Sequence, residues 1–348
     1  MILTRKKALK LAKKDCSLPV LGHYRDGNHY VTIFEDGTKV SQTIFSWSKR
    51  LTFDFPTNMD IKISDQCPIG CKYCHESSTP NGKIGDIMNL PFVDTLTPGT
   101  EIAVGGGSAL NHPDLIPFLE KLKSKGVLAN LTVNQKELQI PKLAEKMKEI
   151  LKRSLVRGVG VSLTDNKTFN QTVDEIFGAY PNLVVHTIAG ILSKDDMPCI
   201  KGRKTLILGY KDLQGRRAGD FYKAEKDKVM KNILLLKYNL PYIQRITKLI
   251  SFDCLAIEQL DPKKTLHVSD SDWNTLFQGD DYAAKTKTGK IQNSTMYVDA
   301  VTRTVARSST QPLNERLSFT DEDIKALFKK SCSNYKPITK TKQKDVKD

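Results

Sequence analysis

Short apolar runs alternate with amphipathic segments through the middle of the chain. Seven of these runs have the length and composition of buried strands, and they lie at residues 59–64, 101–106, 128–133, 158–163, 183–188, 205–210 and 249–257. Strands that alternate with helices in this way predict a parallel sheet with helices on its outside. Because six or seven such units favour a barrel, we expect an α/β fold built on a partial (β/α)6 TIM-like barrel.

The segments between these runs carry helical patterns. Residues 112–126 begin near a proline suited to a first turn and end at Gly126, the usual residue just past a helix C-terminus. Residues 141–155 place Leu143, Met147, Ile150 and Leu151 on one helical stripe. Residues 227–240 show the same pattern before the last run. These three segments are predicted to be helices that cover the sheet.

Both ends of the chain depart from the alternation. Residues 27–46 read as a hairpin around Asp36-Gly37, a pair that favours tight turns. Residues 294–301 and 304–310 read as a second hairpin, followed by a helix over 319–332 with Thr320 as N-cap and Asp321 and Asp323 in its first turn. The predicted organisation is an N-terminal basic segment and hairpin (1–54), a core barrel (55–260), a C-terminal extension (261–333) and a disordered lysine-rich tail (334–348).

Composition indicates a globular protein of the cytoplasm. The 348 residues are 39% hydrophobic and 27% charged, and no apolar run approaches the roughly 20 residues of a membrane span. The first residues lack the apolar core of a secretory signal. We therefore expect a cytoplasmic location, no membrane partner, and no structural disulfides among the seven cysteines.

The net charge of +15 is concentrated at the ends of the chain. Residues 1–14 hold six basic side chains and no acid, and residues 334–348 carry a net +3, so nine of the fifteen charges are terminal. Solvated basic ends explain this distribution, and an electrostatic contact with nucleic acid or anionic lipid is the alternative.

Three cysteines, Cys67, Cys71 and Cys74, follow the first core strand with the spacing C-x3-C-x2-C. Clustered thiolates in a reducing compartment suggest zinc or an iron–sulfur cluster. Structural zinc normally takes four ligands, and His75 is the one neighbour that would complete a Cys3His set, although adjacent residues rarely both turn onto one metal. A [4Fe–4S] cluster held by three thiolates leaves one iron open to a small molecule.

The motif C-x3-C-x-Φ-C, with Tyr73 as its aromatic residue, after the first strand of a β/α domain resembles the radical S-adenosylmethionine (SAM) superfamily over residues 55–260. This resemblance implies that Cys67, Cys71 and Cys74 hold a [4Fe–4S] cluster whose fourth iron binds SAM. It also implies a reductant such as flavodoxin or ferredoxin, and reductive cleavage of SAM to a 5′-deoxyadenosyl radical that abstracts hydrogen from the substrate.

The resemblance further implies a set of SAM contacts. The family's Gly-Gly-Glu segment after strand two corresponds to Gly105, Gly106 and Gly107, with Ser108 where a carboxylate is expected next. Polar ends of later strands offer Asn134 and Ser162, with Asp165 further on, and an ordinary capping role is equally expected for each. Further contacts are expected at positions after strand one and after strands five and six, namely Tyr73, Gly190 and Tyr210, although His186 and Ser193 depart from the family pattern.

The substrate is not fixed by the sequence. A peptide, a nucleotide or nucleic acid, and a small metabolite all stay open, and no catalytic residue is assigned. Seven side chains at strand ends are candidates for the substrate side: His75, His112, Lys211, Arg216, Arg217, Asp253 and Cys254. For the arginines a solvated face is expected, and for Cys254 a place in the core. Two other functions are kept as alternatives, a nucleic-acid-binding protein with a structural metal and a non-catalytic iron–sulfur protein.

Overall fold

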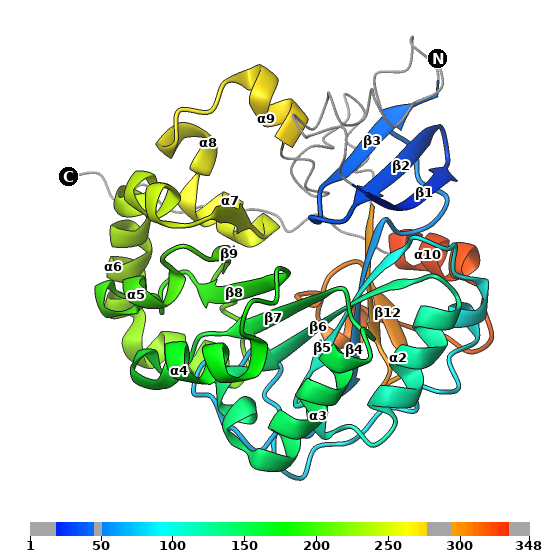
Figure 1. Cartoon of the computed structure of the whole chain (residues 1–348), viewed down its shortest axis with the longest axis horizontal. Coiled ribbons are helices and arrows are strands. Elements are labelled where there is room, and N and C mark those ends of the chain that lie inside the picture. Colours follow the sequence, from blue (N-terminus) through cyan, green and yellow to red (C-terminus); the bar gives the residue numbers. More distant parts are fainter. Residues whose placement is uncertain (1–18, 45–50, 277–293, 334–348) are drawn as a thin grey trace.

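The computed structural model describes residues 19–44, 51–276 and 294–333, and its centre is one ten-stranded sheet with the strand order β10-β9-β8-β7-β6-β5-β4-β11-β12-β13. Strands β4 to β10 are parallel and lie in the order of the sequence (Figure 1). Their bounds are β4 Asn58–Ser64, β5 Glu101–Gly106, β6 Leu128–Asn134, β7 Gly158–Ser162, β8 Leu183–Ile188, β9 Lys204–Leu208 and β10 Leu249–Phe252. The α/β fold with a large, mostly parallel sheet is thereby confirmed, and among the described strands no pairing closes it into a barrel.

The helices follow the strands as the alternation predicts. They are α2 Leu115–Ser124, α3 Pro141–Lys152, α4 Asn166–Phe177, α5 Met197–Ile200, α6 Arg217–Ile246, α7 Cys254–Leu260, α8 Pro262–Thr265, α9 Asp270–Leu276 and α10 Ile324–Ser333, with short 3-10 turns η1 Pro91–Thr95, η2 Ala109–Asn111, η3 Gln135–Gln139, η4 Lys194–Asp196 and η5 Leu313–Glu315. Helix α3 begins at Pro141 and buries Leu143, Met147 and Ile150, which confirms its predicted stripe. Gly126 has φ +68° just past the end of α2, which confirms the predicted helix end.

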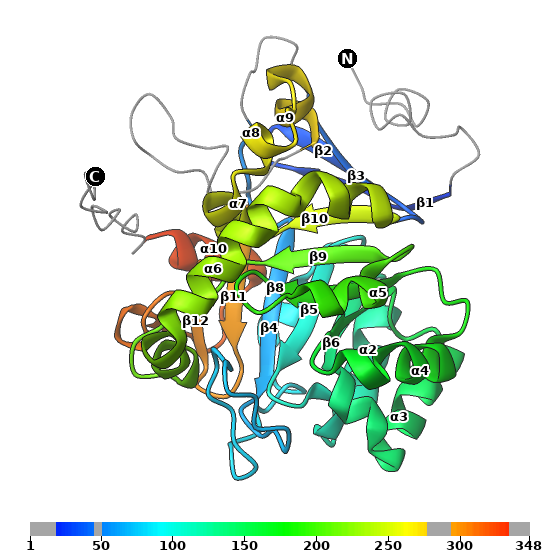
Figure 2. The same cartoon turned by 90° about the vertical axis from the view of Figure 1, so that its left-hand side faces the viewer.

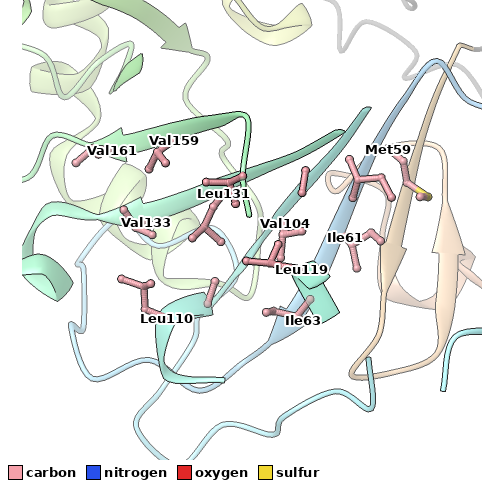
Figure 3. Packing of buried hydrophobic residues seen from close by; sticks show 14 of the residues in the cluster. Met59, Ile61, Ile63, Val104, Leu110, Leu119, Leu131, Val133, Val159 and Val161 are labelled. Carbon is pink, nitrogen blue, oxygen red and sulfur yellow. The ribbon is translucent and has the colours of Figure 1, made fainter. Parts of the chain in front are cut away.

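The main core lies between the outer face of the sheet and these helices. Alternate residues of the central strands, such as Met59, Ile61 and Val104, are almost fully buried there with Leu110 and Leu119 (Figure 3). One side of strands β4 to β9 is therefore buried, whereas the edge strand β10 has no buried residue. The residues that alternate with them point to the other, inner side of the sheet.

The last predicted strand is shorter than expected. Residues 249–252 form the edge strand β10, but Asp253 accepts a hydrogen bond from the backbone of Ala256 and begins helix α7. Within a short apolar run, periodicity does not separate a buried helix from a buried strand, which explains the error.

The predicted C-terminal hairpin is present, and it extends the core sheet. Strand β11 (Thr295–Asp299) pairs antiparallel with β12 (Thr304–Ala306), which pairs with β13 (Leu317–Ser318), and β11 also lies parallel beside β4. The helix that follows begins at Ile324, with the Asp323 carboxylate accepting from the Ala326 amide, so Asp323 is its cap and the prediction for Thr320 is wrong.

The N-terminal hairpin is part of a three-stranded antiparallel sheet: β1 Val20–Asp26, β2 His29–Phe34 and β3 Lys39–Thr43. Its predicted turn is confirmed, with Gly37 at φ +95°, whereas β1 was not expected. The predicted tail at 334–348 and the basic segment at 1–14 lie outside the described residues. Across the described ranges, the structure contains no helix with the length and apolar character of a membrane span.

Figure 2 shows the N-terminal sheet at the amino ends of the core strands. Lys39 forms an ion pair with Glu101 at 2.7 Å, and Arg157 donates to the backbone oxygens of Phe34 and Glu35. The N-terminal sheet therefore sits at the end of the core sheet opposite to the loops that follow the strands.

Candidate functional site

The three cysteines lie on one loop after β4, here called the cysteine loop (residues 65–79). Its two arms run side by side, because the Cys67 amide donates to the Thr79 oxygen at 2.8 Å and the Thr79 amide donates back to Asp65. A turn between the first two cysteines uses Gly70 at φ +66°. All three thiols are half-buried and unpaired. The loop thus presents three sulfurs at the carboxyl end of the first core strand, where sites of parallel β/α folds are built.

The sulfur atoms have polar neighbours. The backbone amides of Ile69 and Gly70 donate to Cys67, and the Asn134 Nδ2 atom lies 3.6 Å from the Cys71 sulfur. Burial raises the pKa of Cys67, and burial together with the neighbouring cysteines raises the pKa of Cys71. Deprotonated thiolates at these positions would therefore be stabilised by a bound positive centre.

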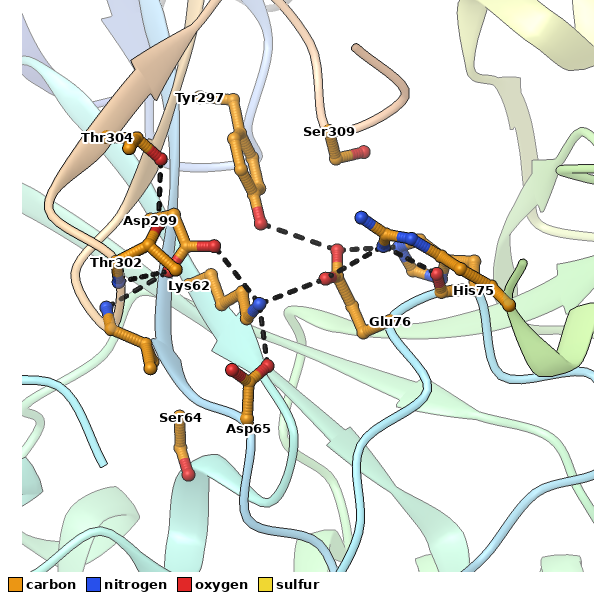
Figure 4. A network of polar contacts seen from close by, with 12 residues as sticks. Lys62, Ser64, Asp65, His75, Glu76, Tyr297, Asp299, Thr302, Thr304 and Ser309 are labelled. Carbon is orange, nitrogen blue, oxygen red and sulfur yellow. Dashed lines mark hydrogen bonds and ion pairs between the residues drawn. The ribbon is translucent and has the colours of Figure 1, made fainter. Parts of the chain in front are cut away.

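A buried lysine joins the two ends of the cysteine loop. The Lys62 ammonium lies 2.6 Å from Asp65, 3.2 Å from Glu76 and 3.1 Å from Asp299 (Figure 4). We call these four residues the Lys62 clamp. Asp65 precedes the first cysteine and Glu76 follows the last, while Asp299 belongs to β11, so the clamp fixes the loop to both β4 and β11.

Further charges surround the clamp. Glu76 also pairs with Arg216 at 3.3 Å and with His75 at 3.3 Å, and Arg316 pairs with Asp299 at 3.3 Å. Burial alone would raise the pKa of Glu76, but the hydrogen bond and charge of His75, with the charges of Lys62 and Arg216, hold it well below its usual range. Glu76 is therefore ionised in the folded protein, and each of the two most buried carboxylates has a cation besides Lys62.

The amino end of α6 is fixed to the cysteine loop. The Arg216 guanidinium donates to the His75 oxygen at 2.7 Å, the Arg217 amide donates to the Ser77 hydroxyl at 2.9 Å, and the Arg217 guanidinium contacts the Ser78 oxygen. The expected solvated face is therefore wrong for these two arginines. They hold the longest helix of the fold against the cysteines.

The glycine run after β5 packs against the first arm of the cysteine loop. Gly106 has φ +119°, and a Cβ at Gly107 would lie 2.4 Å from the Gln66 oxygen. The Gly107 amide donates to the Ser64 oxygen at 2.6 Å. Gly105 differs, because a Cβ there would meet only Thr132 at 3.7 Å. Two of the three predicted SAM-binding glycines are thus required for a close backbone approach within the protein.

A buried carboxylate that the sequence analysis missed lies beside this run. Glu137 accepts from the Asn134 amide at 2.6 Å, and burial raises the pKa of Glu137 to about 7. Asn134 in turn caps η3 and accepts from the Thr164 hydroxyl at 3.1 Å. The only sequence signal for Glu137 is its spacing three residues after Asn134, which is that of a capping box.

A cavity of about 390 Å³ opens beside the cysteine loop. Of the predicted site residues, it is lined by Cys71, Tyr73 and Gly190. The Tyr73 ring packs edge-on against Phe221 at 6.0 Å, and burial raises the pKa of Tyr73 to about 12. Gly190 has φ +88°, and its oxygen accepts from Asn232 at 3.0 Å. The cavity therefore lies between the cysteine loop, the end of β8 and helix α6.

Several lining residues were not predicted. They are the polar or aromatic side chains Lys72, Lys136, Thr164, Phe221, Lys228 and Asn232. Of those on α6, Lys228 and Asn232 lie in the segment predicted only to be a helix, and Phe221 lies before it; nothing local indicates which face meets a loop about 150 residues earlier. Three lysines give the cavity a positive rim, which suits a ligand that carries a carboxylate.

The remaining predicted SAM residues lie outside the cavity lining. Ser162 on β7 lies directly opposite Asn134 on β6, and Asn134 is the residue whose side chain approaches Cys71. Tyr210 is only 4% exposed, and its hydroxyl donates to the Ala218 oxygen at 2.8 Å. The Tyr210 amide and oxygen both bond to the Gln259 side chain, so these two groups have partners within the protein. A contact between Tyr210 and SAM stays a prediction.

The candidate substrate residues separate into two sets. His112 is buried and bonds to the Gly85 oxygen at 2.9 Å, and Asp253 bonds to the Gly209 and Ala256 amides, so both are structural. Cys254 is the first residue of α7. In contrast, Lys211 lies 3.4 Å from the His75 ring and 2.9 Å from the Ser309 hydroxyl. His75 and Lys211 are thus the pair that the fold brings together next to the cysteines.

Comparison with solved structures shows a similar fold in a protein that binds SAM. Streptococcus suis SuiB bound to S-adenosylmethionine matches with a TM-score of 0.50 and 13% identity, over 79% of this chain and 66% of that one. SuiB bound to the precursor peptide SuiA matches with a TM-score of 0.52 and 13% identity, over 80% of this chain and 65% of that one. The chain thus spans just under two thirds of SuiB's length. No protein-family model and no curated protein matches the sequence.

Proposed function

We propose that this protein is a radical SAM enzyme. The observation that carries the proposal is the three-cysteine loop at the carboxyl end of the first parallel strand, beside a cavity, in a fold shared with a protein that binds SAM. The C-x3-C-x-Φ-C spacing adds the resemblance in sequence. We further propose that the core sheet is curved into a partial barrel. The radical SAM core would span residues 55–260, with an extension before it and another after it.

Cys67, Cys71 and Cys74 would hold a [4Fe–4S] cluster. Each thiolate of such a cluster ligates a different iron, so the three sulfurs need not converge on one point as they must around a single zinc ion. The amides that donate to the Cys67 sulfur, and Asn134 beside Cys71, suit a cluster because hydrogen bonds to its sulfurs set its potential. With SAM bound, the cluster supplies one-electron cleavage to a 5′-deoxyadenosyl radical.

SAM would occupy the cavity next to Cys71. Tyr73 and Phe221 offer aromatic faces for the adenine, and Asn232 and Thr164 offer polar contacts. The lysines at the rim would orient the carboxylate of SAM and shield its charge. Gly105, Asn134 and Ser162 stay proposed contacts from the sheet side.

A peptide is the substrate class we favour, because the structural neighbour SuiB has been seen with a precursor peptide. The proposed setting is the cytoplasm, with a flavodoxin or ferredoxin as the reductant. A nucleotide or a small metabolite is the alternative.

The proposal is tested by anaerobic reconstitution with iron and sulfide. SAM and a strong reductant are added, and 5′-deoxyadenosine is measured by mass spectrometry. We expect the parent protein to form it and Cys71→Ala to form none. Cys199→Ala is the matched control, because Cys199 is buried beside α4 and bonds to the Asn166 oxygen, away from the cysteine loop. A colourless, zinc-loaded protein that is inert to SAM would contradict the proposal and favour a nucleic-acid-binding protein with a structural metal.

A further inference from the structure

The inner face of the core sheet carries polar side chains on strands β4 to β8, and several of them reach solvent. We use this name for the side chains that point away from the helices: Asp60, Lys62, Ala103, Gly105, Asn130, Thr132, Asn134, Gly158, Gly160, Ser162, Val184 and His186. On β6 and β8 the outer side chains are buried while the inner ones are half-exposed, and Asp60 on β4 reaches solvent. Exposure in the middle of a ten-stranded sheet is unusual, because a sheet normally buries both faces in a fold of this size.

The Asp60 carboxylate is the unpaired charge of this face. In the part of the chain that the structure describes, no side chain forms an ion pair or hydrogen bond with it. The two inner cations that could do so have other partners: Lys62 is held in the clamp, and Lys211 bonds to Ser309 and lies against His75. Lys211 and Asp253 act on Asp60 only through space.

Small side chains lie on one side of Asp60 along the inner face. Its neighbour on β5 is Ala103, while on the other side β11 places Tyr297, whose ring carries Arg316 at 4.8 Å. Further along the face, Gly158 and Gly160 bring no side chain from β7. The His186 ring lies across Gly160, since a Cβ there would come within 2.2 Å of it. The His186 ring makes no hydrogen bond within the described ranges either, although its backbone is paired in the sheet, so two polar side chains without a side-chain partner lie on the inner face.

The inner face is also bounded at both ends. The N-terminal sheet lies at the amino ends of the strands, with Lys39 on Glu101, and the Lys62 clamp lies towards the carboxyl ends. Asp60 therefore stands between them, accessible to solvent yet surrounded by protein. A charge in such a place is costly without a partner, and burial indeed raises the pKa of Asp60.

We infer that Asp60 binds a cationic group of the substrate, an ammonium or guanidinium, on the inner face. The inference rests on the proposed function, because it names the substrate side of that site. An anionic group is disfavoured, since it would face the unpaired carboxylate while the nearby cations keep their own partners. A neutral group would bind well only if Asp60 stayed protonated. The neutral compound in the test, butyramide, distinguishes this case from binding of a cation.

The test uses the full chain and four small compounds of one length: butylamine, butylguanidine, butyramide and butyrate. The protein is labelled with 13C in its alanine methyl groups, and the methyl of Ala103, the neighbour of Asp60, reports binding. We expect the two cations to shift this signal in a saturable way, and the amide and carboxylate to leave it unchanged. Asp60→Asn should weaken cation binding at least about tenfold, because one charge-assisted hydrogen bond is lost.

Asp227→Asn, on the exposed side of α6, changes the net charge equally and should keep the parent affinity. Ala103→Leu places a larger side chain beside Asp60 and should also reduce cation binding. Because this variant lacks the Ala103 methyl signal, its binding is measured by saturation transfer to the ligand. Butylamine that binds equally to Asp60→Asn, or butyrate that binds in place of the cations, would overturn the inference. Because 5′-deoxyadenosine formation is measured separately, a protein that cleaves SAM but binds no cation refutes only the Asp60 assignment.

Discussion

Replacing Lys62 with methionine tests whether the Lys62 clamp holds the cysteine loop. The variant keeps the length of the side chain and removes its charge, so three carboxylates lose a cation 2.6 to 3.2 Å away. Breaking a buried ion pair by removing one partner costs about 3–5 kcal/mol. Glu76 keeps Arg216, Asp299 keeps Arg316, and Asp65 is partly exposed, so we expect a loss near 3 kcal/mol in the free energy of unfolding.

Urea unfolding of the full chain without added iron, followed by circular dichroism, measures this loss. Lys148→Met is the matched control, because Lys148 pairs with Glu145 at 2.9 Å on the surface of α3, where solvent screens the pair and a much smaller loss of stability is expected. The double variant Lys62→Met/Asp299→Asn should be more stable than the sum of its single changes predicts, since the second change removes an uncompensated charge.

If the free energy of unfolding of Lys62→Met lies within about 1 kcal/mol of the parent value, the clamp contributes no more than a surface ion pair and the reasoning is refuted. Strict additivity with Asp299→Asn would also refute the reasoning, because it would mean that the two side chains do not act on each other. If the clamp acts as described, the iron bound per chain after reconstitution should fall together with stability.

Two further changes test the packing around the site. Gly107→Ala should destabilise the protein by about 1–3 kcal/mol, because its Cβ would collide with the Gln66 oxygen, whereas Gly105→Ala should be tolerated; equal unfolding midpoints would contradict this. Burial lowers the pKa of His186 to about 4, so the unfolded chain takes up a proton between pH 6.5 and 4 that the folded chain does not, and stability falls as the pH falls through that window. In His186→Gln this fall should be smaller by up to about 2 kcal/mol, measured as unfolding free energies at pH 7 and 4.5; an unchanged slope would contradict it.

The local patterns predicted most of the elements but not how distant ones meet. The core strands before β10 and the stripe of α3 follow from periodicity, which is a property of neighbouring residues. The place of β11 beside β4 does not, because its register, such as Asp299 opposite Lys62, joins residues far apart in the chain. The same limit hid the Lys62 clamp, since Lys62 in the sequence is only a polar position within a strand.

The site residues likewise fall into those that a local pattern predicts and those that only long-range contacts reveal. The cysteines could be predicted because their spacing within eight residues carries the signal. Asp60 and Glu137 could not, because an acid in a strand or a turn is ordinary until its surroundings are known. Tyr210 follows β9 at the predicted position, but its side chain is buried, and no local pattern gives that direction.

The pairing of β11 with β4 also sets an order of events during synthesis. Lys62 and Asp299 are 237 residues apart, so the clamp closes only after nearly the whole described chain has been made. Contacts of such long range form late, because the chain between them must be ordered first. The cysteine loop is therefore made early but gains its last anchor late. We expect a nascent chain that stops before β11 to carry all three thiols and to retain iron poorly, so metal loading would follow translation.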